Sequence, residues 1–183
     1  MMLFYIFRHG ETEGNVKNLV QGAGLDLPLN ENGKDQAAVL GQTLAVLKFP
    51  VIYSSQMIRA IETAEIVASY VGAEVESVSG LEEVHFGEAE GMLSEEAHAK
   101  YGDLFEIIND EGHPQYFDAK IPGGESIRES INRSVKALEK IKSKAEGDRV
   151  AVATHGALMH NIYQHYFGLR RRFANCEYFV IDI

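Results

Sequence analysis

The stretch Leu3-Phe4-Tyr5-Ile6-Phe7-Arg8-His9-Gly10-Glu11-Thr12 decides how the rest of this chain is interpreted. Its first five residues are all apolar, which is typical of a strand that is buried on both faces of a parallel sheet. Ligands of open α/β sheets bind at the carboxyl ends of the strands, so the Arg-His-Gly that follows predicts a site there. Arginine suits a phosphate or carboxylate, histidine can act as a nucleophile, and glycine lets the backbone approach a bound group closely.

The rest of the chain alternates between strand-like and helix-like apolar patterns. We expect further strands at 51–53, 74–78, 149–154 and 178–181, and helices at 33–47, 57–71, 95–109, 126–145 and 157–167. Ser126 and Glu129 have the spacing of a capping box, which supports a helix start there. The order β-α-β-α-β, helices, then β-α-β predicts an α/β three-layer sandwich, in which helices flank a mostly parallel central sheet.

Length and composition limit the domain organisation and the partners. We expect one domain over residues 1–183, with a lid or specificity insert around 90–124, because that region is polar and poorly periodic. Seventeen Lys and Arg against 27 Asp and Glu give a net charge of −10, which argues against nucleic acid as a partner. The oligomeric state cannot be read from the sequence.

The cysteine content and the start of the chain bear on localisation. Cys176 is the single cysteine, so no disulfide can form within the chain, which fits a reducing compartment. The apolar start is short and meets Arg8 at once, so we expect neither a signal peptide nor a membrane span. We therefore expect a cytoplasmic protein that does not associate with membranes.

Several chemically active residues follow predicted strands and so converge on one sheet edge. Two strands end in His-Gly, at His9-Gly10 and His155-Gly156, so both imidazoles lie at the carboxyl edge and close together if these strands are neighbours. The strand at 51–53 leads into Ser54-Ser55 and, about one helical turn later, Arg59. Two histidines, two arginines and a carboxylate from Glu82 or Glu83 then form one candidate site.

These motifs resemble those of the histidine phosphatase superfamily, which includes cofactor-dependent phosphoglycerate mutases and broad-specificity phosphatases. The resemblance covers nearly the whole chain and rests on blocks in the family's order. The blocks are Arg8–Thr12 with Asn15, Gln21-Gly22, Asp26–Leu29 with Gly33 and Gln36-Ala37, Ser54-Ser55 with Arg59-Ala60 and Thr63-Ala64, Leu81 with Glu83, Gly87 and Glu90-Gly91, Pro122–Ser126, and His155-Gly156. We therefore expect a phosphoglycerate mutase-like fold.

The resemblance also implies an activity, a phosphomonoesterase for small phosphorylated metabolites. His9 would form a phosphohistidine, and Glu83 would be the general acid and base, with Glu82 as its rival. The resemblance assigns catalytic roles to Arg8, Arg59 and His155 as well, and substrate contacts to Arg8, Asn15, Gln21, Gly22, Arg59, His155 and Gly156. The alternatives are a cofactor-dependent mutase and a low-turnover module that binds phospho-ligands or dephosphorylates phosphohistidine on proteins.

Other interpretations of the charged and histidine residues have weaker support. His155, His160 and His165 do not share a helix face, because a spacing of five turns each about 140° from the last, so we expect no metal site. We expect no cofactor either. Arg170–Arg172 suits the end of a helix, and a recognition patch for a polyanionic substrate is the less favoured alternative. His160 stands where many relatives carry arginine.

Overall fold

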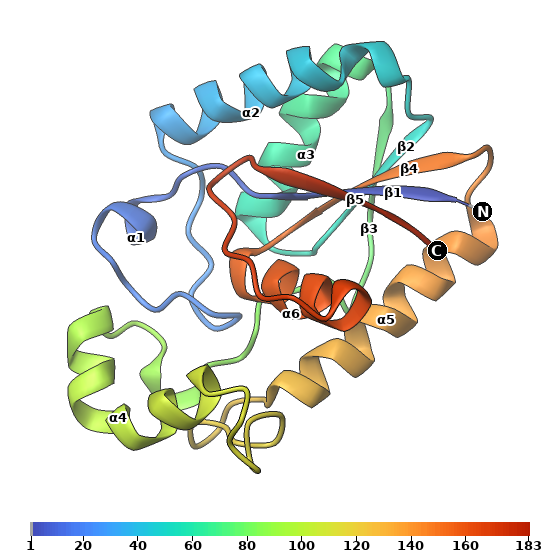
Figure 1. Ribbon diagram of the computed structural model, residues 1–183. Helices are drawn as coiled ribbons and strands as arrows, with labels where there is room; N and C mark the ends of the chain where they lie inside the picture. Colours follow the sequence, from blue (N-terminus) through green and yellow to red (C-terminus); the bar gives the residue numbers. More distant parts are fainter. Residues whose placement is uncertain (1) are drawn as a thin grey trace.

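The computed structural model describes residues 2–183, which form a central five-stranded sheet between two layers of helices (Figure 1). The strands are β1 (Leu3–Arg8), β2 (Val51–Ser54), β3 (Glu74–Ser77), β4 (Arg149–Thr154) and β5 (Tyr178–Asp182). Their order across the sheet is β3-β2-β4-β1-β5. The β5 strand runs antiparallel to β1, whereas the other neighbours are parallel. The predicted mostly parallel α/β sandwich is therefore confirmed.

The five predicted helices lie close to their expected positions, and the structure adds short helices that were not predicted. They are α1 (Glu13–Val16), α2 (Glu31–Leu44), η1 (Ala45–Leu47), α3 (Ile58–Val71), η2 (Gly87–Ala89), α4 (Ser94–Asn109), α5 (Ile127–Lys144) and α6 (Gly156–Phe167). The capping box of α5 forms as predicted: the Ser126 hydroxyl accepts from the Glu129 N–H, and the Glu129 carboxylate accepts from the Ser126 N–H. The α2 helix starts two residues before the predicted 33–47 because the Asn30 side chain caps it by accepting from the Gly33 N–H.

Two apolar layers hold the sheet between its helices. Phe4 and Ile6 of β1 face one layer, which includes residues of α5 and α6, and Phe7 faces the other, which includes residues of α2 and α3. None of these three side chains is exposed to solvent. Full burial of such a side chain stabilises a fold by about 1.5–3 kcal/mol. Because successive side chains of a strand point to opposite faces, this burial fixes which layer each residue of β1 contacts. It also fixes where β1 delivers its polar C-terminal residues.

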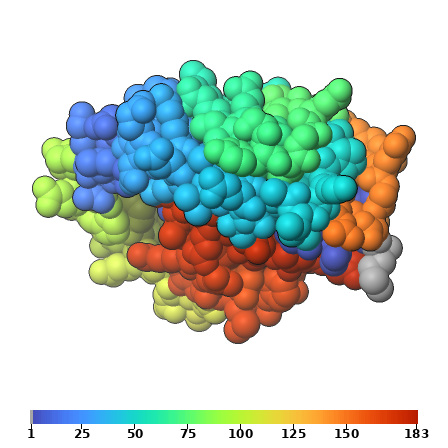
Figure 2. All heavy atoms as spheres, turned by 90° about the horizontal axis from the view of Figure 1, so that it is seen from above, coloured from blue at the N-terminus to red at the C-terminus, as the bar shows by residue number. Residues whose placement is uncertain are grey.

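The α1 and α4 helices lie beyond the carboxyl ends of the parallel strands (Figure 1). Figure 2 shows the blue atoms of the α1 region and the yellow-green atoms of the α4 region at the same end of the molecule. The α4 helix belongs to the predicted insert at 90–124, and it packs a small apolar cluster of its own around Ala89, Ala97 and Ile121. Its action as a lid stays a prediction. No helix within residues 2–183 is long and apolar enough to cross a membrane.

Candidate active site

His9 and His155 lie side by side at the carboxyl edge of the sheet. Their strands, β1 and β4, are direct neighbours, and the His9 N–H donates to the Thr154 carbonyl at 2.9 Å. The two imidazole centroids are 5.2 Å apart. Both side chains are buried, with 2% and 0% of their surface exposed. The structure therefore brings together the two histidines that the strand ends place at one edge.

The His9 ring has a defined tautomer. Its Nδ1 lies 2.7 Å from the Gly10 carbonyl oxygen, which can only accept, so Nδ1 carries the proton. Its Nε2 accepts from the Arg59 Nε–H at 3.3 Å, which requires a free lone pair there. Burial, together with the charges of Arg59 and Arg8, holds the pKa of His9 well below 6.5. His9 is thus a neutral imidazole with its Nε2 lone pair directed at a guanidinium.

The ring of His155 contacts the hydroxyl group of Ser55. The Ser55 Oγ lies 2.8 Å from His155 Nε2 and accepts the Met57 N–H at 3.3 Å. Burial and the charge of Arg59 lower the pKa of His155 well below 6.5, so this ring is neutral too. If the buried hydroxyl donates to Nε2, every polar atom of this group is satisfied except Nδ1, which then carries the proton. The sequence motif contained Ser55 but gave no hint of this contact.

Arg8 and Arg59 hold two different positions around the histidines. The Arg59 side chain is 1% exposed and donates to the carbonyls of Gly22 at 2.8 Å and Leu25 at 3.0 Å. Arg8 donates from Nη1 to the Phe173 carbonyl at 2.8 Å. A side chain at position 156 would place its Cβ 3.0 Å from Arg8 Nε, so Gly156 allows this close approach.

Two buried side-chain nitrogens lack a hydrogen-bond partner within residues 2–183. They are Arg8 Nε and His155 Nδ1. An unpaired buried donor costs about 1–3 kcal/mol, so native structures rarely keep one without a reason. Both donors belong to this site, and an anionic oxygen is the kind of partner that would satisfy them.

A cavity of about 260 Å³, here called the histidine cavity, joins most of the predicted site residues. Its wall includes Arg8, His9, Asn15, Gln21, Gly22, Arg59 and Glu83. The polar side chains of its loop are tied to one another, because the Thr12 hydroxyl donates to Gln21 Oε1 at 3.0 Å and its N–H donates to Asn15 Oδ1 at 3.1 Å. The His155 ring lies beside that of His9 at a tilt of 56°, and Gly156 lies against Arg8. All the predicted site residues therefore meet at one place.

Glu83 is fixed by the first turn of α6. Its carboxylate accepts from the N–H groups of Ala157 at 3.1 Å and Leu158 at 2.9 Å, and from its neighbour Val84 at 2.9 Å. Glu82, its rival, accepts instead from the Gly80 N–H at 2.8 Å and forms part of neither cavity wall.

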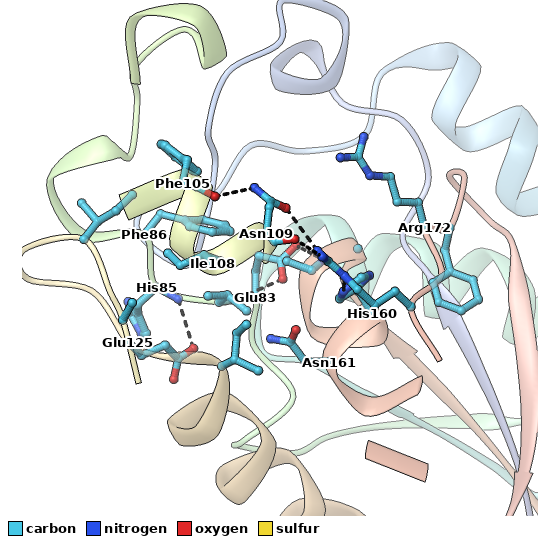
Figure 3. Close-up of a pocket in the computed structure, with 18 of the residues that line it drawn as sticks. Glu83, His85, Phe86, Phe105, Ile108, Asn109, Glu125, His160, Asn161 and Arg172 are labelled. Carbon is cyan, nitrogen blue, oxygen red and sulfur yellow. Dashed lines mark hydrogen bonds between the residues drawn. The ribbon is translucent and has the colours of Figure 1, made fainter. Parts of the chain in front are cut away.

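A second cavity of about 420 Å³, here called the α4 cavity, adjoins the first one (Figure 3). It lies between α4, α6 and residues 84–86, and Glu83 is part of both walls. The three arginines at 170–172 do not form one patch: Arg170 and Arg172 line this cavity, whereas Arg171 pairs with Glu177.

Some polar contacts around the site were not predicted from the sequence. The Thr63 hydroxyl accepts the Gly10 N–H at 3.0 Å, and the Asn175 amide donates to the His9 carbonyl at 3.0 Å. Glu90 joins two loops by accepting from the N–H groups of Ala23 at 3.1 Å and Phe86 at 2.9 Å. Thr63 and Glu90 stand in the matching blocks, whereas Asn175 carries no motif signal. Within residues 2–183, no cluster of three His, Cys, Asp or Glu side chains is placed to hold a metal ion.

The fold is that of a phosphoglycerate mutase-like protein. A solved phosphoglycerate mutase from Bacillus anthracis superposes with a TM-score of 0.88 at 27% identity, covering 98% of this chain and 86% of that one. The sequence profile of the histidine phosphatase superfamily (branch 1) matches residues 4–182. The chain belongs to the histidine phosphatase superfamily.

Two relatives from Arabidopsis thaliana carry different names. Phosphoglycerate mutase-like protein 4 is 35% identical over 162 residues, which are 87% of this chain and 68% of the relative. Metal-independent phosphoserine phosphatase is 36% identical over 161 residues, 86% of this chain and 66% of the relative. The chain thus spans about two thirds of the length of both plant proteins. The predicted family is confirmed, and phosphatases and mutase-like proteins both occur among its relatives.

Proposed function

We propose that this chain is a phosphomonoesterase that hydrolyses small phosphorylated metabolites through a phosphohistidine on His9. One observation carries the proposal: a buried, neutral imidazole directs its Nε2 lone pair at the Arg59 guanidinium, 3.3 Å away, inside a cavity that Arg8 and Glu83 also line. A neutral imidazole is the nucleophilic form, and fixed cations are what a transferring phosphoryl group needs. A relative named as a phosphatase supports the same direction.

In the first step, His9 Nε2 attacks phosphorus in line with the ester oxygen. The Nε2–P bond forms as the bond from phosphorus to the ester oxygen breaks, and the Gly10 carbonyl stabilises the Nδ1–H that becomes more acidic. The departing oxygen takes a proton from the carboxyl group of Glu83, which lies where the histidine cavity and the α4 cavity meet. The alcohol then leaves through the α4 cavity.

In the second step, water attacks the phosphohistidine and the same residues act in reverse. The Glu83 carboxylate takes a proton from the water as its oxygen bonds to phosphorus, and the Nε2–P bond breaks to restore neutral His9. The three backbone N–H groups on Glu83 hold its oxygens in place for both proton transfers. Dividing hydrolysis in this way replaces one difficult step by two easier ones.

Four groups stabilise the charge on the transferring phosphoryl oxygens. Arg8 and Arg59 supply guanidinium donors, His155 supplies its Nδ1–H, and Asn15 supplies a neutral contact. Arg8 Nε and His155 Nδ1 suit this role because both are buried donors without a partner in the described chain. Loss of one such preorganised donor typically lowers the rate by about 10²–10³.

Product analysis with 3-phosphoglycerate and phosphoserine tests the proposal. We expect release of inorganic phosphate in proportion to the alcohol formed, from at least one member of a panel of metabolite esters. Formation of 2-phosphoglycerate without phosphate release would instead support a mutase. No phosphate release from any ester between about pH 5 and 8 would support a binding module, because histidine sites titrate in that range.

A further inference from the structure

The α4 cavity continues directly from the histidine cavity. Both cavities share Arg8, Glu83, Phe86, His98 and Phe105 as wall residues. A phosphate ester whose phosphoryl group lies beside His9 would therefore extend its alcohol past Glu83, and the α4 cavity is the space that receives it. Figure 3 shows Glu83 between the α4 side chains and those of α6.

The walls of the α4 cavity are mainly apolar. Phe105 and Ile108 come from α4, Phe86 and Ile121 come from the loops on either side of that helix, and Phe173 closes the opposite end. These five side chains offer no hydrogen bonds to an alcohol with several hydroxyl or carboxylate groups. They would instead remove apolar surface of a ligand from water, which is favourable.

Several polar side chains of the same walls are already hydrogen-bonded to other groups of the protein. Arg170 donates to the Asn109 carbonyl at 2.6 Å, to its side-chain oxygen at 3.1 Å and to His160 Nε2 at 3.2 Å. Glu125 accepts from both Nε and Nη2 of Arg133. These contacts reduce the number of donors that the cavity offers to a small acidic alcohol, although Arg172 also lines its wall.

The volume of the α4 cavity also favours a bulky alcohol. At about 420 Å³, the α4 cavity by itself falls in the range of about 300–1,000 Å³ that is usual for drug-sized ligands. A three-carbon alcohol such as glycerate or serine would leave most of it to water. We propose that the substrates are phosphate monoesters of bulky, mainly apolar alcohols, with a ring or branched chain against Phe105 and Ile108. This inference rests on the proposed function and adds the class of substrate.

Two alkyl esters test this preference. Ethyl phosphate and 2-phenylethyl phosphate both release primary alcohols of similar basicity, so a difference in kcat/KM reports the contact with the ring and not the chemistry of the leaving group. We expect kcat/KM to be about 10-fold to 100-fold higher for the phenylethyl ester, which is what burial of a phenyl-sized group is worth. Equal values would overturn the inference, while the proposed phosphatase activity would stand.

A filled cavity provides the second test. Ala119 is half-buried in the α4 cavity wall, so Ala119→Trp places a ring where the substrate ring would lie. We expect the ratio of the two kcat/KM values to fall close to one. Val46→Trp is the control, because Val46 is 83% exposed and lies in η1. The ratio does not depend on the folded fraction, and a wild-type ratio in Ala119→Trp would overturn the inference.

Binding separates this inference from the proposed function. Ethylphosphonate and 2-phenylethylphosphonate cannot be hydrolysed, and calorimetry measures their affinity for the wild-type protein even if no ester turns over. We expect at least about tenfold tighter binding of the phenylethyl compound. Equal binding, or no binding of either compound, would contradict an apolar alcohol site. A clear preference without hydrolysis would contradict the phosphatase proposal alone.

Discussion

Replacement of Ser55 by alanine tests how the second histidine is held. Ser55 is fully buried, and its hydroxyl lies 2.8 Å from His155 Nε2. In Ser55→Ala, His155 Nε2 loses its partner, so neither ring nitrogen is hydrogen-bonded within residues 2–183 and the Nδ1–H form is no longer favoured over the other tautomer. The donor that the proposed mechanism directs at the phosphoryl group is then present only part of the time.

The size of the effect follows from the hydrogen bond that is lost. A buried acceptor left without its donor costs about 1–3 kcal/mol, which corresponds to roughly a 5-fold to 150-fold change in an equilibrium or a rate. We therefore expect kcat/KM to fall by about that factor. The full loss of a preorganised donor, about 10²–10³, sets the upper limit. The free energy of unfolding should fall by about 1–3 kcal/mol as well.

Ser54→Ala is the matched control for this experiment. Ser54 is equally buried and its hydroxyl donates to the Ser55 carbonyl at 2.8 Å, so its loss also destabilises the fold without touching His155. Steady-state kinetics and ¹⁵N NMR of the imidazole nitrogens are the assays. We expect the wild-type protein to carry the His155 proton on Nδ1, and only Ser55→Ala to lose both that signature and activity. A wild-type proton on Nε2, or equal activity in the two variants, would refute the reasoning.

Three further predictions concern other parts of the site. Arg59→Lys should lower kcat/KM by at least about 10², because one ammonium cannot reach His9 and the Gly22 and Leu25 carbonyls together. The control Arg149→Lys, at the first residue of β4, should leave the kinetics unchanged, and an active Arg59→Lys would count against the role of the cation. Glu90→Ala should raise KM for small esters, because the Ala23 and Phe86 N–H groups lose their acceptor. Glu90→Gln should keep KM near the wild-type value, because its amide oxygen can still accept from both groups. A raised KM in Glu90→Gln would show that the negative charge of Glu90 matters instead. The free energy of unfolding, followed by urea denaturation, should decrease as the pH falls below about 6.5, because His9 and His155 have lowered pKa values in the folded state and the unfolded chain binds more protons there. Above that pH the two groups contribute a constant amount. An equal dependence of the unfolding free energy on pH in a variant that lacks both imidazoles would contradict the assignment.

Much of the fold could be predicted because the apolar pattern is strong where the layers meet. The run before Arg8 is buried on both faces of the sheet, and the α5 capping box is local in sequence, so both are visible without coordinates. The α1 helix was not predicted because it has only four residues, too few for a periodic pattern. Its start depends on the Thr12 and Asn15 capping contacts, which are a local but weak signal.

The site residues could be predicted as a set, but not their contacts. His9, Arg59 and Glu83 stand in blocks that resemble the superfamily, and the neighbouring positions of β1 and β4 bring two of the strand ends together. The Ser55 contact joins residues 100 positions apart, and the Asn175 contact joins residues 166 apart. No local pattern encodes such pairs, because the sheet order and the loop paths create them.

A trapped phosphoryl-enzyme tests the central claim most directly. After rapid quenching of turnover with a ³²P-labelled ester, we expect acid-labile, base-stable label on the protein, which mass spectrometry locates at His9. The ³¹P spectrum should show phosphate on Nε2, because the Gly10 carbonyl occupies Nδ1. His9→Asn should carry no label and release no phosphate. Label on another residue, or continued hydrolysis by His9→Asn, would contradict the account.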